Sequence, residues 1–248
     1  MVERRVWRKR ARSRAELRRE VEALRLLGPS AVRLLRVEGE VLVLERVWPG
    51  TPAAARPDDE ALAAITATLL ALWTPVLPGC GLPTVRQECT ALDDPDAVEP
   101  LPAAIVHTAR RVLDQLLREP AQDRVLHGDL HQRNLLWSED RGWVAIDPHG
   151  VVGDPGYDVG PLLINPWNAD PAALLCHRLP LLAQRLDMPV ERVAGWGLVR
   201  AVLAEAWHVQ DTGQVAGGAL QVAERLARWS IDKKTASAEG DAPPLELA

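Results

Sequence analysis

The sequence predicts an α+β fold, with a helix and a β-hairpin in a small N-terminal part and a mainly helical remainder. Three observations predict it: apolar residues at helical spacing near the start, two β-rich runs around a short acidic turn, and long helical segments separated by Pro and Gly. A length of 248 residues favours one large domain or two unequal lobes.

The first predicted helix spans residues 14–27. Ser13 and Glu16 have the spacing of a capping box, and the apolar residues that follow recur every three to four positions up to Gly28. On this helical wheel Glu20 lies beside the apolar face, so it is the carboxylate expected to face inward.

The other elements follow from β-rich runs and from helical periodicity between Pro and Gly. The predicted strands are 31–37, 41–47, 124–126, 134–137 and 143–146. The predicted helices are 58–73, 102–118, 171–186, 190–209 and 216–230. The uncharged stretch 61–85 is interpreted as a helix and a loop because Pro75, Pro78 and Pro83 interrupt it.

Composition and charge exclude several classes of protein. Apolar residues make up 47% and charged residues 25%, as in an ordinary soluble globular protein. The net charge of -5 speaks against nucleic acid or an anionic membrane as the main partner. The three cysteines have no metal-type or redox-type spacing and the basic N-terminus is no secretory signal, so the cytoplasm is expected.

The chemistry concentrates in residues 127–134, which read HGDLHQRN, the pattern H-x-D-x-x-x-x-N. Asp147 follows at the end of the third short strand. This layout is typical of phosphoryl transfer: Asp129 would accept the proton of an attacking hydroxyl, while Asn134 and Asp147 would hold the Mg²⁺ that bridges the nucleotide phosphates.

This segment has two other interpretations. His-Gly-Asp alone is also a turn sequence in which the Asp caps a backbone amide. His127 and His131 form a second alternative, a metal-binding pair, but Gly128 and the flanking strands favour a loop over the helix that this spacing would need.

The surrounding sequence resembles a known family. Residues 125–167, with the run IDPHGVVGDPGYD and Asn165-Pro166-Trp167, together with AEAWHVQDTG at 204–213, resemble the aminoglycoside phosphotransferases, and among them the streptomycin 6-kinases and hydroxyurea antibiotic-resistance kinases. With REVEALRLLG and VLVLERVWPGTP, the resemblance covers about residues 6–215.

The resemblance implies a protein-kinase-like fold of two lobes with ATP in the cleft. It divides the chain into a partial N-terminal lobe at 1–48 and a catalytic and substrate lobe at 49–235, and the composition of residues 236–248, with Ser, Gly, Asp and paired Pro, predicts a flexible tail. The family has two further strands and a phosphate-covering loop ahead of its lysine strand, so the N-terminal β lobe is expected to be truncated.

The same resemblance implies roles for individual residues. Asp129 matches the catalytic base, and Asn134 and Asp147 match the metal ligands. Glu20 matches the glutamate that pairs with an ATP-binding lysine. Lys9 is the only lysine before the catalytic loop and is therefore the candidate, the alternative being one cation of a solvated basic run.

Further residues are expected around the nucleotide and the catalytic loop. Glu45 and Val47 fall at the hinge, where backbone groups would meet adenine. Asp158 matches an aspartate that braces the catalytic loop through backbone hydrogen bonds, and His127 is placed with it as a supporting residue.

The candidate residues for the acceptor site follow from the chemistry of the substrate class. A streptomycin-like substrate carries guanidinium groups, which carboxylates bind in a fork geometry. The candidates are Asp154, Asp158, Glu205 and Asp211, with Asp211 preferred, and Trp167 and Trp207 as walls of the pocket. Each carboxylate has the alternative of a solvated charge or a cap, and each Trp that of a core residue.

These observations predict a cytoplasmic, ATP- and Mg²⁺-dependent kinase that phosphorylates a hydroxyl of a streptomycin-like aminoglycoside and so confers resistance. The expected partner is a small aminoglycoside or a similar polyol or amine, and the expected state is a monomer or weak dimer. Two alternatives remain: a small-metabolite kinase of the same fold, and a catalytically weak binding or regulatory pseudo-kinase, which the short N-terminal lobe favours.

Overall fold

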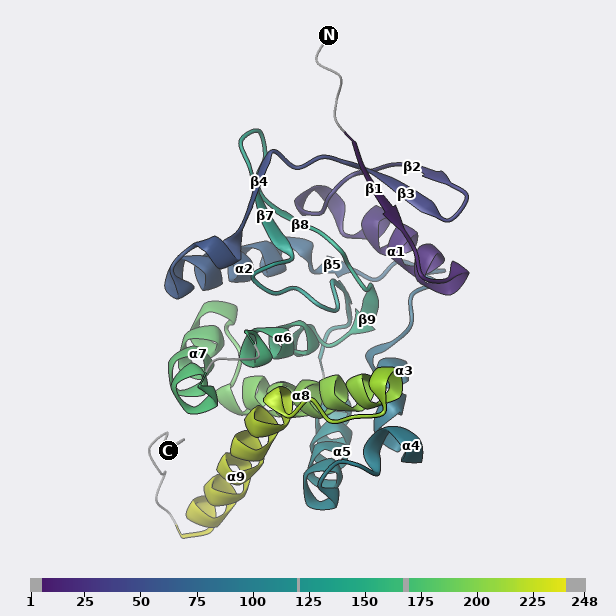
Figure 1. Ribbon diagram of the computed structural model, residues 1–248. Helices are drawn as coiled ribbons and strands as arrows, with labels where there is room; N and C mark the ends of the chain where they lie inside the picture. The colour runs from purple at the N-terminus through teal and green to yellow at the C-terminus, as the bar shows by residue number, and fades with distance from the viewer. Residues whose placement is uncertain (1–5, 120, 167–169, 240–248) are drawn as a thin grey trace. The chain divides into compact units, whose positions relative to one another are not determined.

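A computed structural model describes the backbone of residues 6–119, 121–166 and 170–239, and the side chains of these residues up to 229 (Figure 1). The helices are α1 (Arg14–Leu26), α2 (Asp58–Leu72), α3 (Val85–Glu88), α4 (Pro95–Val98), α5 (Ala103–Arg118), α6 (Gly160–Ile164), α7 (Pro171–Leu186), α8 (Val190–Thr212) and α9 (Gly218–Glu239). The strands are β1 (Val6–Arg10), β2 (Leu34–Glu38), β3 (Val41–Glu45), β4 (Pro49–Pro52), β5 (Thr74–Pro75), β6 (Arg124–Leu126), β7 (Leu135–Ser138), β8 (Gly142–Ala145) and β9 (Val151–Gly153).

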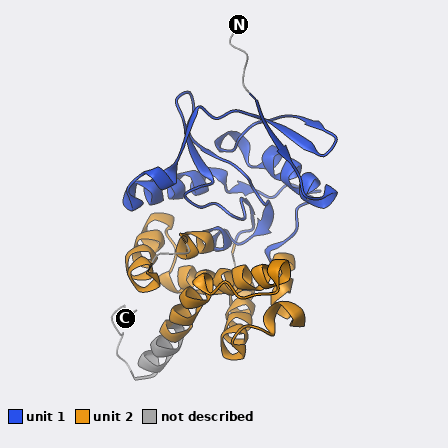
Figure 2. Ribbon diagram, viewed as in Figure 1, with its two compact units in different colours: residues 1–85, 122–158 blue, residues 86–121, 159–248 orange. Residues whose placement is uncertain are grey.

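The chain forms two compact units, and it passes from one to the other three times (Figure 2). Unit 1 contains residues 1–85 and 122–158, and unit 2 contains residues 86–121 and 159–248. All nine strands belong to unit 1, whereas unit 2 is helical in its described part.

The first part of unit 1 is an antiparallel sheet of order β1-β3-β2 with α1 beside it. The central strand β3 is the most buried of the three, as its apolar sequence predicts. Helix α1 begins with one half of the predicted capping box, in which the Ser13 side chain accepts from the Glu16 N–H at 3.1 Å. Glu16 Oε2 accepts from the Arg12 N–H at 2.7 Å, one residue before the N-cap Ser13. The helix buries Ala23 and Leu24.

Two small antiparallel sheets complete unit 1, with strand orders β4-β7-β8 and β5-β6-β9. Strand β6 lies in one of these sheets and β7 in the other, so residues 127–134 form the crossing between them. Asp147 follows β8, and β9 returns from it to pair with β6. This topology brings the ends of β6 and β8, and the polar residues after them, into one unit.

Unit 2 is built around α8, which is buried along most of its length. Gly195 lets α8 approach α5 closely: a Cβ there would lie 3.3 Å from Val112 and 3.4 Å from Leu116. The buried Glu205 accepts hydrogen bonds from the N–H groups of residues 216, 217 and 220, at 2.9–3.1 Å, and so caps the start of α9.

The predicted elements are largely present, with differences at the ends. The structure forms β4 at 49–52, outside the predicted strands, because these residues pair with β7 across a long sequence separation. Helix α9 continues to Glu239 beyond the predicted end at 230, since no Gly or Pro interrupts 231–239. Of the predicted tail, 236–239 belong to α9 and 240–248 lie outside the described residues.

The predicted lobe boundary after residue 48 stays a prediction, while the compact units divide after residues 85, 121 and 158. None of the described helices is both long enough and apolar enough to cross a membrane.

Candidate active site

The loop between β6 and β7 holds the H-x-D-x-x-x-x-N residues in a compact turn. The Asn134 N–H donates to the His131 carbonyl at 2.9 Å, and Asn134 Nδ2 donates to the Asp129 carbonyl at 3.0 Å. Because Nδ2 is committed, the amide oxygen of Asn134 is left for a further contact. The Asp129 side chain is 28% exposed, so a ligand can reach its carboxylate.

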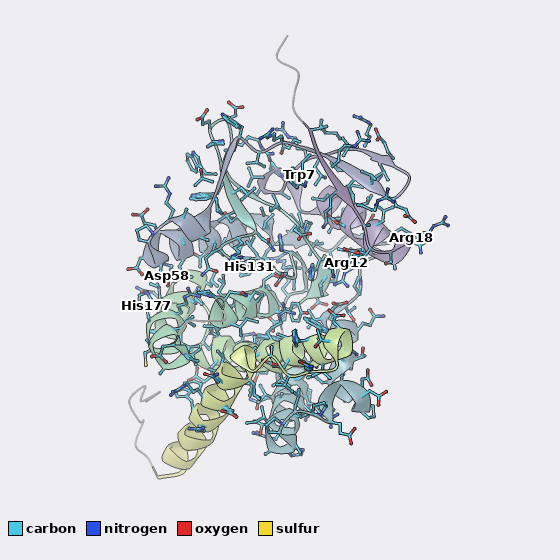
Figure 3. All side chains as sticks on the ribbon, viewed as in Figure 1. Trp7, Arg12, Arg18, Asp58, His131 and His177 are labelled. Atoms are coloured by element: carbon cyan, nitrogen blue, oxygen red, sulfur yellow. The ribbon has the colours of Figure 1, made fainter. Side chains whose placement is uncertain are left out.

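His131 (labelled in Figure 3) lies next to the Asp129 carboxylate. Its Nδ1 accepts from the Arg133 N–H at 3.2 Å, and its Nε2 lies 3.7 Å from Asp129 Oδ2. The His131 ring is therefore used within this loop, and the structure gives no support to a His127/His131 metal pair.

His127 is fully buried, and both ring nitrogens contact the backbone. Its Nε2 lies 2.9 Å from the Ile146 carbonyl, and its Nδ1 accepts from the Asp129 N–H at 3.3 Å. Both bonds form only in the neutral tautomer with the proton on Nε2. Burial lowers the pKa of His127 to about 4, against the opposing influence of Asp129 and of the bond to Ile146. The His127 ring thus links the backbone of Asp129 to that of Ile146, the residue before Asp147.

The carboxylate of Asp158 holds the start of the same loop. It is fully buried, and Oδ2 accepts from the His127 N–H at 3.0 Å and from Trp73 Nε1 at 3.1 Å. Oδ1 accepts from the Gly128 N–H at 2.6 Å. Bonds from backbone N–H groups to a carboxylate are strong and directional, so Asp158 fixes where the chain turns toward Asp129.

Three charged side chains from separate elements meet at Lys9. From β1, Lys9 Nζ donates to Glu20 Oε2 on α1 at 2.8 Å and to Asp147 Oδ1 at the end of β8. Glu20 is 3% exposed, which agrees with the inward orientation that its helical wheel predicts. Lys9 is 26% exposed and is no solvated member of the basic run.

The pKa values of the three groups follow from this contact, and burial is the largest influence on each. Burial raises the pKa of Glu20. It opposes the shifts of the other two: hydrogen bonds to Asp147 and Glu20 raise the pKa of Lys9, and Lys9 lowers the pKa of Asp147. At neutral pH Lys9 is therefore an ammonium and Asp147 a carboxylate, as phosphate and cation binding require.

The donor set fits Mg²⁺. Asp147, whose side chain is 47% exposed, offers a carboxylate oxygen, and Asn134 offers an amide oxygen. Mg²⁺ prefers oxygen ligands and keeps several waters, so these two residues and phosphate oxygens would suffice. Among the described residues no three His, Cys, Asp or Glu cluster as a metal cage, so the remaining ligands would come from nucleotide and water.

The side chain of Glu45, at the predicted hinge, is held by two contacts. Glu45, the last residue of β3, accepts from the Arg33 N–H at 3.0 Å and forms an ion pair with Arg141 of the β7–β8 turn. Arg141 also donates to the Ala31 carbonyl at 3.0 Å. The Glu45 N–H also donates to the Arg33 carbonyl at 2.9 Å, so adenine binding by backbone groups of Glu45 and Val47 stays a prediction. Sequence reasoning missed Arg141 because it lies 96 positions after Glu45, and no local pattern in the sequence signals the contact.

The candidate acceptor residues do not share one environment. In unit 1 Asp154 is buried, and its Oδ1 accepts from the Gly156 N–H at 2.9 Å, as a turn residue does. In unit 2 Asp211 is exposed in the last turn of α8, and the Arg200 guanidinium lies 5.0 Å from the centre of the Trp207 ring. Of the three candidates Asp154, Asp211 and Trp207, Asp211 is the one whose side chain has no contact described here.

Two further residues, Glu205 and Trp167, were expected at the acceptor site. Glu205 is committed to the backbone at the start of α9 and cannot serve as a ligand without uncapping that helix. Trp167 lies outside the described residues.

Comparison with known proteins points to a family of kinases. The family model described as aminoglycoside/hydroxyurea antibiotic resistance kinase matches residues 5–213. A streptomycin 6-kinase of Streptomyces griseus is 34% identical over 81% of this chain and 70% of its own length. A hydroxyurea phosphotransferase of Kitasatospora aureofaciens is 35% identical over 76% of this chain and 57% of its own length. The chain thus spans from little more than half to about two thirds of these relatives.

Solved structures agree on the fold at low identity. A choline kinase from Streptococcus pneumoniae superposes with a TM-score of 0.63 at 14% identity, covering 94% of this chain and 88% of its own. A thermostable mutant of an aminoglycoside phosphotransferase gives 0.60 at 18% identity, covering 91% and 86%. The predicted protein-kinase-like fold is confirmed. With the family model matching most of its length, the chain belongs to the aminoglycoside/hydroxyurea antibiotic resistance kinase family.

Proposed function

We propose that this chain transfers the γ-phosphoryl group of ATP to a hydroxyl group of a streptomycin-like aminoglycoside and thereby confers resistance. The observation that carries the proposal is the joint placement, in one compact unit, of the Asp129 carboxylate, the oxygen donors of Asn134 and Asp147, and the Lys9–Glu20 pair. Family membership supports the acceptor class, because its relatives are named as streptomycin and hydroxyurea kinases.

Each residue has a defined task in this reaction. Asp129 accepts the hydrogen bond of the acceptor hydroxyl and orients its oxygen toward the γ-phosphorus. It takes the proton as the new P–O bond forms, while the bond from the γ-phosphorus to the β–γ bridging oxygen breaks and ADP leaves. Lys9 binds phosphate oxygens, and Glu20 holds the ammonium in place. Asp147 and Asn134 would hold Mg²⁺, which when bound neutralises charge on the phosphates. His127 and Asp158 keep the loop in position.

The finer assignments belong to this proposal. We expect backbone groups of Glu45 and Val47 to bind adenine, and Asp211 to bind a guanidinium group of the acceptor. Since the reaction consumes ATP, we expect the protein to act in the cytoplasm. We also expect it to be a monomer or weak dimer.

The test is ADP release by the purified chain with Mg-ATP, in the presence and absence of streptomycin. Asp129→Asn is the matched control, because it keeps the size of the side chain. Streptomycin-dependent release that falls at least about 100-fold in the variant, at an unchanged unfolding temperature, supports the proposal. Release that is equal with and without streptomycin, or that persists in Asp129→Asn, overturns it.

A second acceptor is favoured by a specific relative. The hydroxyurea phosphotransferase matches at 35% identity, about as well as the streptomycin kinase at 34%. Hydroxyurea also offers a hydroxyl group, and it is a far smaller molecule. We therefore include hydroxyurea in the same assay: release with hydroxyurea but not with streptomycin would move the assignment to that substrate.

A further inference from the structure

We propose that Arg19 is a positioning residue that holds the segment 147–150 against α1, and so keeps Asp147 where Lys9 and a cation can reach it. The importance of Arg19 for catalysis rests on the proposed function. The contacts that carry the inference all lie within unit 1.

The contact begins on α1, immediately before Glu20. Arg19 Nε donates to the Gly150 carbonyl at 2.9 Å. The two neighbouring residues of one helix thus reach both ends of the same segment: Glu20 reaches Asp147 through Lys9, and Arg19 reaches Gly150 directly. A displacement of either end would disturb the other.

Both backbone polar groups of Gly150, the N–H and the carbonyl, form hydrogen bonds. Its N–H donates to the His127 carbonyl at 3.0 Å, while its carbonyl accepts from Arg19. Its Cα also lies against α1, because a Cβ at this position would be 2.5 Å from the Ala23 Cβ. Gly150 is therefore the point at which α1 and the catalytic loop are joined.

The other end of the segment needs such support. Asp147 has a φ of 60°, in the left-handed region that residues other than Gly rarely adopt. A conformation of this kind persists when surrounding contacts determine it. Only Pro148 and His149 separate Asp147 from Gly150, so fixing the Gly150 carbonyl restricts the backbone that presents Asp147.

The side-chain chemistry suggests three variants. Arg19→Met places a methyl carbon where Nε lies, keeping an apolar stem but no donor. Arg19→Gln places an amide nitrogen at the same number of bonds from Cα, so it restores the donor without the charge. Arg18→Met is the matched control, since Arg18 is the adjacent, exposed arginine of α1 (labelled in Figure 3).

The first measurement is amide hydrogen exchange of peptides covering 146–153 in the ligand-free protein. Loss of one net hydrogen bond predicts exchange about fivefold faster in Arg19→Met, and rates near wild type in Arg19→Gln and Arg18→Met. Calorimetric titration with Mg-ADP should show binding about fivefold weaker in Arg19→Met only.

Kinetics separate positioning from general damage. At saturating Mg-ATP the ligand itself holds the segment, so kcat should stay within about twofold while the KM for Mg-ATP rises in Arg19→Met. Unchanged exchange and binding in Arg19→Met, or equal losses in Arg19→Met and Arg19→Gln, would overturn the inference. If the wild-type chain transfers no phosphate, the proposed function fails, yet hydrogen exchange still decides whether Arg19 positions the segment.

Discussion

Lys9 and Glu20 illustrate how much depends on a single buried pair. Glu20 is 3% exposed and its carboxylate has Lys9 as its cation, so removing the ammonium leaves a buried negative charge. We expect Lys9→Met to lower the free energy of unfolding by about 2 kcal/mol and to abolish nucleotide binding. The double variant Lys9→Met/Glu20→Leu should regain stability, because an apolar pair needs no charge compensation, but it should not regain activity.

Chemical denaturation and an ADP-binding titration on the same three proteins test this expectation. A double variant as unstable as Lys9→Met would show that the pair contributes through shape rather than through charge. Nucleotide binding that survives in Lys9→Met would remove Lys9 from the site.

His127 makes the stability of the protein depend on pH. Its pKa is lowered from 6.5 to about 4 on folding, so the folded state favours the neutral ring. This contribution is fully present above the unfolded value and is lost progressively as the pH falls from that value to the folded one. Between about pH 7.5 and about pH 5 the stabilisation lost should be about 2 kcal/mol.

His127→Gln isolates this contribution, since glutamine keeps a donor for the Ile146 carbonyl and does not titrate. Denaturant midpoints of the two proteins, measured across that pH range, should converge as the pH falls. Parallel curves would mean that His127 does not protonate on unfolding in this range.

At the scale of elements, the connection between α8 and α9 depends on one side chain. The buried Glu205 accepts three backbone N–H bonds from residues 216–220. Glu205→Ala leaves these donors without their acceptor and should cost about 3 kcal/mol of unfolding free energy. Because every nucleotide-site residue lies in unit 1, the KM for ATP should not change. Thermal unfolding and steady-state kinetics check the two parts, and a raised KM with intact stability would contradict the structural role.

The elements show what the sequence can and cannot predict. Helix α1, the hairpin that follows it and the loop at 127–134 carry local signals, namely a cap, periodicity and a spaced polar motif, and they were predictable. Strand β4 and the Arg141–Glu45 pair depend on partners far along the chain, so no local pattern reports them. The inward position of Glu20 was predictable from a helical wheel, whereas the contact of its neighbour Arg19 with Gly150 was not.

At the scale of the whole molecule, charge is distributed unevenly. The protein carries a net charge of -5, yet residues 6–48 contain 11 Arg and Lys against 6 Glu. The part of the chain that carries Lys9 is thus basic, which should attract a polyanionic nucleotide. We expect the KM for ATP to rise with ionic strength while the KM for an uncharged acceptor such as hydroxyurea stays constant. Kinetics at several salt concentrations measure both, and equal salt dependence would show that the asymmetry has no part in nucleotide capture.

The division into two units also has a consequence for synthesis of the chain. Helix α5 packs on α8 at Gly195, but residues 119–189, including the whole loop at 127–134, are translated between the two helices. Unit 1 can close once residue 158 has left the ribosome, whereas the apolar face of α5 must wait for the last third of the chain. Because domains generally fold as units during translation, unit 1 with the proposed nucleotide site should mature first, with α5 exposed to chaperones and to aggregation in the interval.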